Sequence, residues 1–192
     1  MNISLVNLIS DFKSSGKGLM SEAQYISVAN EINKVQPCNL LIFGLGEDSH
    51  LWRDINKDGQ TFFLEDDDDW IAKFSNKNLN IYSVAYTTKA EDHKSINFNT
   101  DKLKMDLPEK IKSIPWDIIF VDGPLGHNPP RPYKGPGRMQ SIYAAHCLLK
   151  VGGICIFDDM GRLIESEYSN HFFGSDNMYN LIEDKVGFFK KI

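Results

Sequence analysis

Asn39-Leu-Leu-Ile-Phe-Gly-Leu-Gly-Glu-Asp-Ser49 is the stretch that decides the fold of this chain. Its first half contains an unbroken apolar run, Leu40 to Phe43, which is typical of a parallel strand buried on both faces of a sheet. Gly44 and Gly46 follow at once, and the polar residues 47–49 lead into a helical pattern. A strand, a glycine turn and a helix start let the backbone approach a nucleotide or nucleoside closely. The stretch therefore predicts the ligand-binding turn of an α/β fold.

Acidic residues distinguish this turn from a dinucleotide-binding one. A third glycine would let a pyrophosphate pass over the helix N-terminus, but this chain has Asp48 and Ser49 there. Glu47 and Asp48 add negative charge, which argues against an anionic ligand. A cationic or zwitterionic ligand such as S-adenosylmethionine (SAM) suits the charge better. The same turn also closes ordinary strand–helix corners, so the motif alone leaves ligand binding open.

Length and composition indicate one soluble domain. The chain has 192 residues, of which 42% are hydrophobic and 24% charged, as in ordinary globular proteins. A formal charge of −5 disfavours a nucleic-acid partner, which usually meets a basic face. No signal peptide or transmembrane run is recognisable. We therefore expect a cytoplasmic protein with no membrane partner, in which Cys38, Cys147 and Cys155 are free, buried thiols.

A helical preface, residues 1–36, precedes a core of residues 37–192 within the single domain. Ser21 and Gln24 match the S-x-x-Q capping box that begins a helix. Five apolar residues then recur on one helical face: Tyr25, Val28, Ala29, Ile32 and Val35. The preface is expected to cover the sheet; folding over a cofactor is the alternative.

Apolar runs downstream of the glycine turn predict the other strands. Four of them are expected at residues 60–65, 79–86, 118–121 and 154–157, with helical patterns between them. Residues 168–173 and 186–192 are expected to add the last two strands as a hairpin, and the polar residues 87–104 to form a loop. This alternation predicts a mostly parallel seven-stranded sheet with helices on both faces.

Four of these strands end in a glycine turn or a carboxylate: Gly44 and Gly46, then Glu65, then Asp122, then Asp158 and Asp159. Ligands of open parallel sheets bind outside the carboxyl ends of the strands, so these ends are expected to meet at one crevice. Glu65 stands 19 residues after Gly46, where doubly wound folds place the acid that binds ribose hydroxyls. Asp66 is included as a cofactor candidate, although residues 66–69 also suit a solvated helix start.

Asp122, Asp158 and Asp159 allow three interpretations. Oxygen ligands of this kind suit a hard divalent cation such as magnesium or manganese, which would lower the pKa of a bound hydroxyl. Without a metal, Asp122 would act directly as the general base. In the third interpretation, an acid after the fifth strand only caps a turn and a single carboxylate reaches the substrate. The sequence leaves these alternatives open.

Four blocks carry a family resemblance: NLLIFGLGEDSHLW, TFFLEDDDDW, PWDIIFVDGP and GPGRMQSIYAA. In this order, from about residue 37 to residue 162, they resemble the glucuronoxylan 4-O-methyltransferase family and its polysaccharide-biosynthesis relatives, the DUF579 group. The resemblance implies a Rossmann-like class I SAM-dependent methyltransferase fold and methylation of a sugar hydroxyl on a glycan or glycoconjugate.

The resemblance also implies roles for particular residues. SAM would be held by the turn residues Gly44, Gly46, Asp48 and Ser49, with its ribose at Glu65 and its methyl group facing Asp122. Asp158 would lie beside the reacting hydroxyl, and Arg138 would order the neighbouring loop or bind sugar. The placement of carboxylates after the fourth and fifth strands also resembles the metal-dependent catechol and caffeoyl-CoA O-methyltransferases.

The chain departs from the family in two places. Glu47 stands where the family motif has histidine, and the proline-rich loop of residues 125–136 is longer and more basic. Fixed φ angles make such a loop rigid, which suits a substrate wall. In it His127 is a candidate second base and Arg131 a candidate sugar ligand; Arg162 is a further substrate candidate, although each also suits an exposed rim. A different acceptor glycan is therefore expected.

Three rival functions remain at this stage. The first is a metal-dependent O-methyltransferase acting on a small diol or catechol-type molecule. The second is a nicotinamide-dependent oxidoreductase, which the acidic turn disfavours because its cofactor carries a pyrophosphate. The third is a non-catalytic binding domain that keeps the fold. The identity of the sugar and the oligomeric state do not follow from the sequence.

Overall fold

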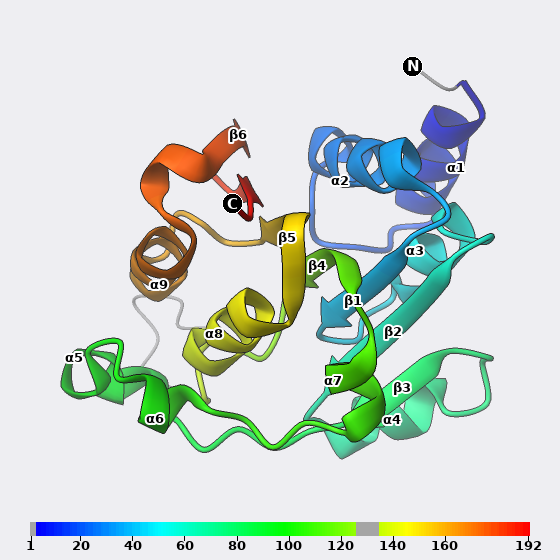
Figure 1. Cartoon of the computed structure of the whole chain (residues 1–192). Helices are drawn as coiled ribbons and strands as arrows, with labels where there is room; N and C mark the ends of the chain where they lie inside the picture. The colour runs from blue at the N-terminus through cyan, green and yellow to red at the C-terminus, as the bar shows by residue number, and fades with distance from the viewer. Residues whose placement is uncertain (1–2, 126–134) are drawn as a thin grey trace.

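The computed structural model describes residues 3–125 and 135–192, and these form a seven-stranded sheet in the order β3-β2-β1-β4-β5-β7-β6 (Figure 1). The first five strands pair in parallel, and β7 runs antiparallel to both β5 and β6. The strands are β1 (Asn39–Phe43), β2 (Gln60–Glu65), β3 (Asn80–Ser83), β4 (Trp116–Val121), β5 (Leu149–Phe157), β6 (Met178–Ile182) and β7 (Val186–Lys190). The predicted mostly parallel sheet is confirmed.

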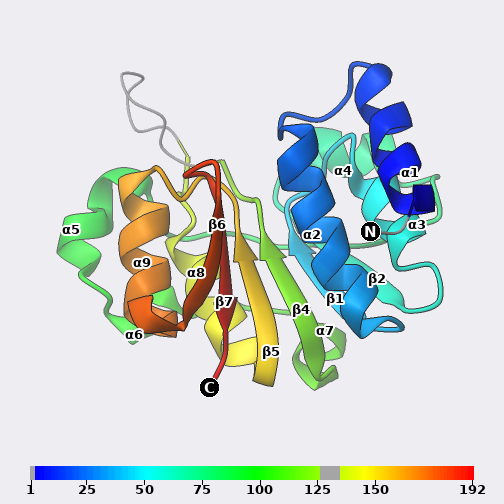
Figure 2. The ribbon, with the colours of Figure 1, turned by 90° about the horizontal axis from the view of Figure 1, so that it is seen from above.

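Helices cover both faces of the sheet, as predicted (Figure 2). One face carries α1 (Ile3–Ser14), α2 (Glu22–Val35), α3 (Ser49–Ile55) and α4 (Asp68–Phe74); the other carries α5 (His93–Ile96), α6 (Thr100–Leu103), α7 (Glu109–Ser113), α8 (Met139–Leu148) and α9 (Leu163–Phe173). Strand β1 explains the division. Leu40 and Ile42 pack with the first group, and Leu41 and Phe43 pack with the second. Side chains alternate between faces, so an apolar run of this kind fills two cores.

The preface begins as the sequence predicted. Ser21 Oγ accepts from Gln24 N at 3.2 Å, and Gln24 Oε1 accepts from Ser21 N at 2.9 Å, which completes the capping box of α2. Tyr25, Val28, Ala29 and Ile32 are buried against the sheet, whereas Val35 at the end of the helix is exposed.

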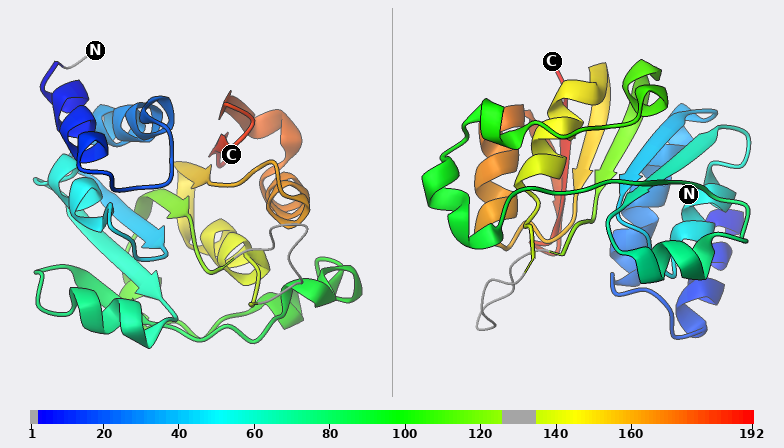
Figure 3. Two further views of the ribbon diagram at one scale, coloured as in Figure 1. Left: turned by 180° about the vertical axis from the view of Figure 1, so that it is seen from behind. Right: turned by 90° about the horizontal axis from the view of Figure 1, so that it is seen from below.

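Three expectations about the chain were wrong in detail. Residues 168–173 belong to helix α9, and the strand that pairs with β7 is β6, residues 178–182. Residues 87–104 contain a 3-10 turn (Ala90–Asp92) and the short helices α5 and α6. They belong to the connection from β3 to β4, which runs across to α9 and back (Figure 3). Ile164, Tyr168 and Phe173 of α9 are buried in the same core cluster, and this tertiary packing stabilises a helix where the local pattern favours a strand.

The cysteines and the helices bear on two further expectations. Cys38, Cys147 and Cys155 are all free, but Cys147 is exposed, so only two of the thiols are buried. Among the described residues, no helix combines the length and the apolar character that crossing a bilayer requires.

Candidate functional site

Two adjoining cavities open at the carboxyl ends of the parallel strands. The smaller, of ≈ 460 Å³, lies between the turns that follow β1, β2 and β4. The larger, of ≈ 850 Å³, extends from the first turn toward the end of β5 and the loop after α1. They share six lining residues: Leu45, Gly46, Asp48, Trp70, Asp122 and Leu125. Both volumes fall within the range of about 300–1,000 Å³ that is usual for small-molecule sites.

Carboxylates dominate the smaller cavity. Its described lining contains five of them, from Asp48, Glu65, Asp66, Asp67 and Asp122, and no lysine, arginine or histidine. Burial raises the pKa of Asp48, of Glu65 and of Asp122 above the ordinary carboxyl value, because the charged form loses water. A ligand that brings positive charge would restore the ionised forms. The acidic lining therefore suits a ligand that carries positive charge.

The glycine turn brings β1 and β4 into backbone contact beside this cavity. Gly44 has φ +108°, and a Cβ at this position would lie 3.0 Å from the backbone nitrogen of Gly123. The Asp122 N–H donates to the carbonyl of Phe43 at 3.0 Å. At Gly46 a Cβ would lie 2.9 Å from Asp48 Oδ1. A side chain at Gly44 would strain the left-handed backbone and press on Gly123, and a side chain at Gly46 would displace the Asp48 carboxylate.

Glu65 is fixed in place at the end of β2. Its Oε2 accepts from the Leu45 N–H at 2.7 Å, and its Oε1 accepts from the N–H groups of Asp66 and Asp67, each at 2.9 Å. These bonds connect the β1 turn to the β2 turn through one carboxylate that is only 7% exposed. Each carboxylate oxygen has two lone pairs, so Oε1 is fully used and Oε2 can accept one further hydrogen bond from a ligand hydroxyl.

The two residues after Glu65 have different surroundings. Asp66 is exposed at the rim of the smaller cavity. Asp67 caps helix α4, accepting from Asp69 N at 2.9 Å and Trp70 N at 3.2 Å. The expected acidic helix start is thus observed, beginning one residue after Asp66.

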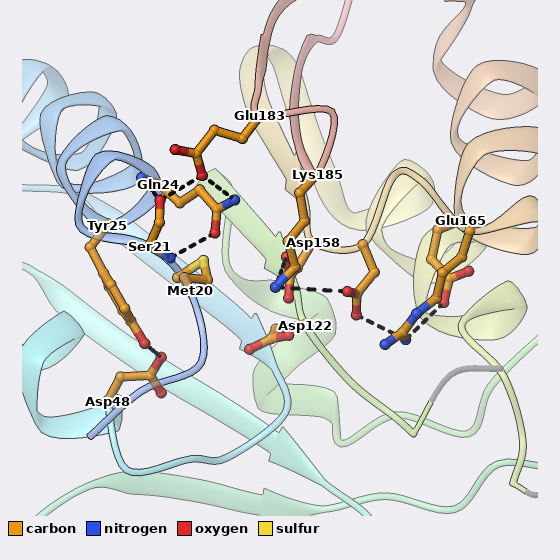
Figure 4. Close-up of polar contacts among 12 residues, drawn as sticks. Met20, Ser21, Gln24, Tyr25, Asp48, Asp122, Asp158, Glu165, Glu183 and Lys185 are labelled. Atoms are coloured by element: carbon orange, nitrogen blue, oxygen red, sulfur yellow. Dashed lines mark hydrogen bonds and ion pairs between the residues drawn. The ribbon is translucent and has the colours of Figure 1, made fainter. Parts of the chain in front are cut away.

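The remaining turn residues have separate structural partners. Ser49 is buried, and its Oγ accepts from Gly46 N at 2.9 Å, so the hydroxyl stabilises the turn. Asp48 stands at the N-cap of α3, yet its side chain makes no capping bond. Its Oδ2 accepts from the Tyr25 hydroxyl of α2 at 2.9 Å (Figure 4).

Arg138 connects the ends of β4 and β5. It is 5% exposed, donates from Nη1 to the carbonyl of Asp158 at 2.9 Å and from Nε to that of Pro124 at 3.2 Å. Its Nη2 pairs with Asp159 Oδ2 at 3.1 Å and Asp122 Oδ1 at 3.4 Å. Arg138 lines the larger cavity, but these contacts make it an organiser of the two strand ends.

Asp122 faces both cavities with Asp158 beside it (Figure 4). Burial raises the pKa of Asp122 well above its ordinary value; the positive charge of Arg138 lowers it, and the charge of Asp158 raises it again. Asp158 is 6% exposed, and its Oδ1 has no hydrogen-bond partner but lies 3.5 Å from Lys185 Nζ. A carboxylate of raised pKa next to a cavity suits a general base.

The three carboxylates predicted as metal ligands have cationic partners instead. Asp159 pairs with Arg162 at 2.8 Å as well as with Arg138, and Lys185 lies 3.9 Å from its Oδ1. Within residues 3–125 and 135–192, no group of three or more His, Cys, Asp or Glu side chains is arranged to hold a metal ion. The arrangement therefore does not fit the three-carboxylate metal centre, because arginine and lysine side chains balance the acids.

Two residues of this region were missed at the sequence level. Lys185 reaches the site from the β6–β7 turn, and Glu165 of α9 lies 3.9 Å from Arg138 Nε while being 1% exposed. Residues 183–185 connect β6 to β7, and Glu183 and Asp184 have positive φ angles of 53° and 52°, as in tight hairpin turns. Nothing in the spacing of Glu165 indicates a site residue, since it lies within a helix outside the recognised blocks.

Of the three remaining predicted site residues, the structure describes one. Arg162 lines the larger cavity. His127 and Arg131 lie outside the residues that the structure describes.

Comparison with known proteins identifies relatives over most of the chain. A family model described as IRX15/IRX15L/GXM matches residues 23–103 and 93–189. Three proteins of Arabidopsis thaliana are similar: glucuronoxylan 4-O-methyltransferase 3 (32% identity; 90% of this chain, 64% of the relative), glucuronoxylan 4-O-methyltransferase 2 (36%; 77% and 58%) and arabinogalactan O-methyltransferase 1 (30%; 74% and 57%). The chain thus spans less than two thirds of the length of these relatives.

Solved structures show the same fold at low sequence identity. The 16S rRNA N2 G1207 methyltransferase RsmC of T. thermophilus, in complex with AdoMet and guanosine, matches with a TM-score of 0.57 at 18% identity, over 91% of this chain and 44% of that one. A TehB-like SAM-dependent methyltransferase from Corynebacterium glutamicum matches with a TM-score of 0.55 at 12% identity, over 95% and 94%. These likenesses confirm the predicted class I methyltransferase fold.

Proposed function

The chain belongs to the IRX15/IRX15L/GXM family, and on that premise we propose that it is a SAM-dependent O-methyltransferase acting on a sugar hydroxyl of a glycan or glycoconjugate. The observation that carries the proposal is the smaller cavity, with five carboxylates and no basic side chain in its described lining. Relatives named for methylation of glucuronoxylan and arabinogalactan support a carbohydrate acceptor.

The residues of the smaller cavity fit SAM. Glu65 lies at the position of the ribose-binding acid and keeps one lone pair, on Oε2, to accept from a ribose hydroxyl, and Asp48 can accept from the ammonium group. The closely packed turns at Gly44 and Gly46 leave the backbone accessible to the ligand. When bound, SAM supplies an electrophilic methyl group on a positively charged sulfur. Asp66 at the rim remains a candidate for the outer part of the nucleoside.

Asp122 is the group that we assign to the acceptor proton. Its carboxylate faces both cavities, so it can contact an acceptor hydroxyl in the larger one while the cofactor lies in the smaller one. Asp122 would take the proton of the acceptor hydroxyl, so that the oxygen could accept the methyl group that SAM would supply. Arg138, paired with Asp122 at 3.4 Å, fixes the carboxylate. Lys185 balances the charge of the neighbouring Asp158.

The larger cavity is the acceptor site in this account. Its described lining carries four cationic side chains, Lys17, Arg138, Arg162 and Lys185, next to the carboxylates. The Arg162 side chain is 23% exposed, whereas that of Arg138, the other arginine in the described lining, is 5% exposed. Its greater exposure suits contact with a sugar. The roles of Arg131 as a sugar ligand and of His127 as a second base stay predictions.

Cofactor affinity should depend on pH and on ligand charge. Asp48, Glu65 and Asp122 have raised pKa values in the free protein, and a bound cation favours their ionised forms. SAM affinity should therefore be greatest at a pH above these raised pKa values and should fall as the pH drops through them. The loss should begin at a higher pH than the ordinary carboxyl pKa values of 3.8 and 4.5 would give. S-adenosylhomocysteine, whose thioether is neutral, should show a shallower dependence.

Calorimetric titrations with SAM, S-adenosylhomocysteine and NAD at a series of pH values test this. We expect the first two ligands to bind and NAD not to bind, with a SAM to S-adenosylhomocysteine affinity ratio that falls toward acid pH. Binding of NAD in place of SAM would favour the oxidoreductase alternative. A SAM to S-adenosylhomocysteine affinity ratio that does not change with pH would show that the ionisation of these carboxylates is not coupled to the sulfonium charge.

A chelator should leave methyl transfer intact. Lys185 and Arg138 already balance Asp158, Asp159 and Asp122, so we derive no step that requires a divalent cation. Turnover measured before and after dialysis against EDTA should agree within about twofold, because EDTA would remove at most a weakly bound surface ion. Loss of activity that magnesium or manganese restores would contradict this and favour the metal-dependent diol or catechol alternative.

A further inference from the structure

We propose that Tyr25, in helix α2 of the preface, is a positioning residue of the cofactor site, and that its hydroxyl holds the Asp48 carboxylate toward the cavities. The proposal rests on the proposed function, because it takes Asp48 as a SAM ligand. It extends the role of the preface: the segment was expected to cover the sheet, with folding over a cofactor as the alternative, and it would do both.

The Tyr25 ring is held rigidly. The residue is 0% exposed, its ring stacks on Trp52 of α3 with centroids 5.4 Å apart and 27° between planes, and Phe12 of α1 contacts it edge-on at 5.4 Å. Aromatic pairs of this geometry restrict the ring to one orientation. The hydroxyl is thereby directed at Asp48 Oδ2, 2.9 Å away (Figure 4).

Asp48 occupies a position that normally has another use. An aspartate at a helix N-cap usually accepts from the backbone N–H groups of the first turn. Here the side chain makes no such bond, and the Tyr25 hydroxyl donates to it, with the Trp52 side chain as a further partner. Asp48 lines both cavities. Burial, and then the charge of Asp48, raise the pKa of Tyr25, so the phenol stays protonated and remains a donor.

The loop before α2 encloses the Tyr25 hydroxyl. Gly18 has φ +76°, and a Cβ there would lie 2.1 Å from Tyr25 Oη, so only glycine fits. Lys13 Nζ fixes this loop by donating to the carbonyls of Gly18 at 3.2 Å and Met20 at 2.7 Å. Residues 16–20 in turn form one wall of the larger cavity.

The start of α2 is also tied to the opposite side of the site. Ser21 Oγ and Gln24 Nε2 both donate to Glu183 Oε2, at 2.7 Å and 2.8 Å. Glu183 belongs to the β6–β7 turn, whose Lys185 lies beside Asp158 (Figure 4). These contacts restrain the start of α2, and with it Tyr25, relative to the β6–β7 turn, as a positioning role requires.

The test compares Tyr25→Phe with Tyr168→Phe. Tyr168 is a matched control because it is also buried and its hydroxyl donates to a backbone carbonyl, that of His93 at 3.1 Å, in α9 on the other face of the sheet. We expect Tyr25→Phe to weaken SAM binding about tenfold, as loss of an outer partner of a binding group does. Tyr168→Phe should change SAM affinity by less than about twofold, although both variants lose a buried hydrogen bond and unfold at lower temperature.

A double-mutant cycle with Asp48→Asn separates positioning from general loosening. If Tyr25 acts through Asp48, the effect of Tyr25→Phe on SAM affinity shrinks when Asp48 is already replaced. Equal losses of affinity in Tyr25→Phe and Tyr168→Phe, or fully additive losses in the cycle, would overturn the inference while leaving the proposed function standing. Failure of the wild-type protein to bind SAM would instead overturn the proposed function. Thermal unfolding of every variant checks that each is folded.

Discussion

Replacing Asp122 by asparagine should lower kcat by about 10²- to 10⁴-fold, the usual contribution of a general base. Asparagine keeps the size of the side chain and can still accept from Arg138 Nη2, so the two strand ends stay connected. It cannot take a proton from the acceptor hydroxyl. SAM affinity should change by less than about tenfold, because Glu65 and Asp48 still line the cavity and only one carboxylate near the sulfur is neutralised.

Asp117→Asn is the matched control for this variant. Asp117 lies on the same strand, β4, but toward its other end, where Oδ2 accepts from Asn39 N at 2.7 Å and the carboxylate pairs with Lys150. Its replacement should lower stability and leave kcat nearly unchanged. Initial rates and calorimetric SAM affinities of the two variants provide the comparison. If Asp122→Asn loses SAM binding while remaining folded, Asp122 belongs to the cofactor and the base must be sought elsewhere.

Replacing Glu65 by glutamine should weaken SAM binding by about 10- to 100-fold. A hydrogen bond to a charged group contributes about 1.5–3 kcal/mol, and about 1.4 kcal/mol corresponds to a factor of ten. The amide oxygen can still accept from one of the backbone N–H groups that Glu65 now binds, so the turns keep part of their connection. At saturating SAM, kcat should fall much less than the affinity.

Glu47→Gln controls for the loss of one negative charge near the site. Glu47 lines the larger cavity, but its exposed carboxylate pairs with Lys73. An exposed ion pair contributes about 0–1 kcal/mol, so SAM affinity should change by no more than a few-fold. Equal weakening by both substitutions, measured by calorimetry at one salt concentration, would mean that overall charge and not the position of Glu65 determines affinity.

The elements that sequence reasoning placed well are those with strong local signals. The capping box at Ser21 and Gln24 and the strand at residues 60–65 were predicted at their observed bounds. The glycine turn also followed directly from the sequence, because Gly44 and Gly46 occupy positions where another side chain would displace backbone or a carboxylate. Local stereochemistry fixes these features.

The features that were missed depend on tertiary contacts. The aromatic residues of α9 suit a strand in isolation, and only packing against α8 and the sheet makes them helical. Lys185 enters the site because the β6–β7 hairpin folds back beside β5. Arg138 illustrates the same limit: its block was recognised, but its three carboxylate partners come from β4, β5 and α9 and could not be paired by sequence.

Transfer of a labelled methyl group tests the proposed glycan O-methylation. The purified protein is incubated with SAM labelled in the methyl group and with glucuronoxylan or arabinogalactan, and the polysaccharide is then treated with alkali. We expect the label in the polysaccharide to survive alkali, because a methyl ether on a sugar hydroxyl is not hydrolysed. We also expect about 10²- to 10⁴-fold less label with Asp122→Asn. Label released by alkali would indicate a methyl ester on a carboxylate; that result, or transfer undiminished in Asp122→Asn, would contradict the proposal.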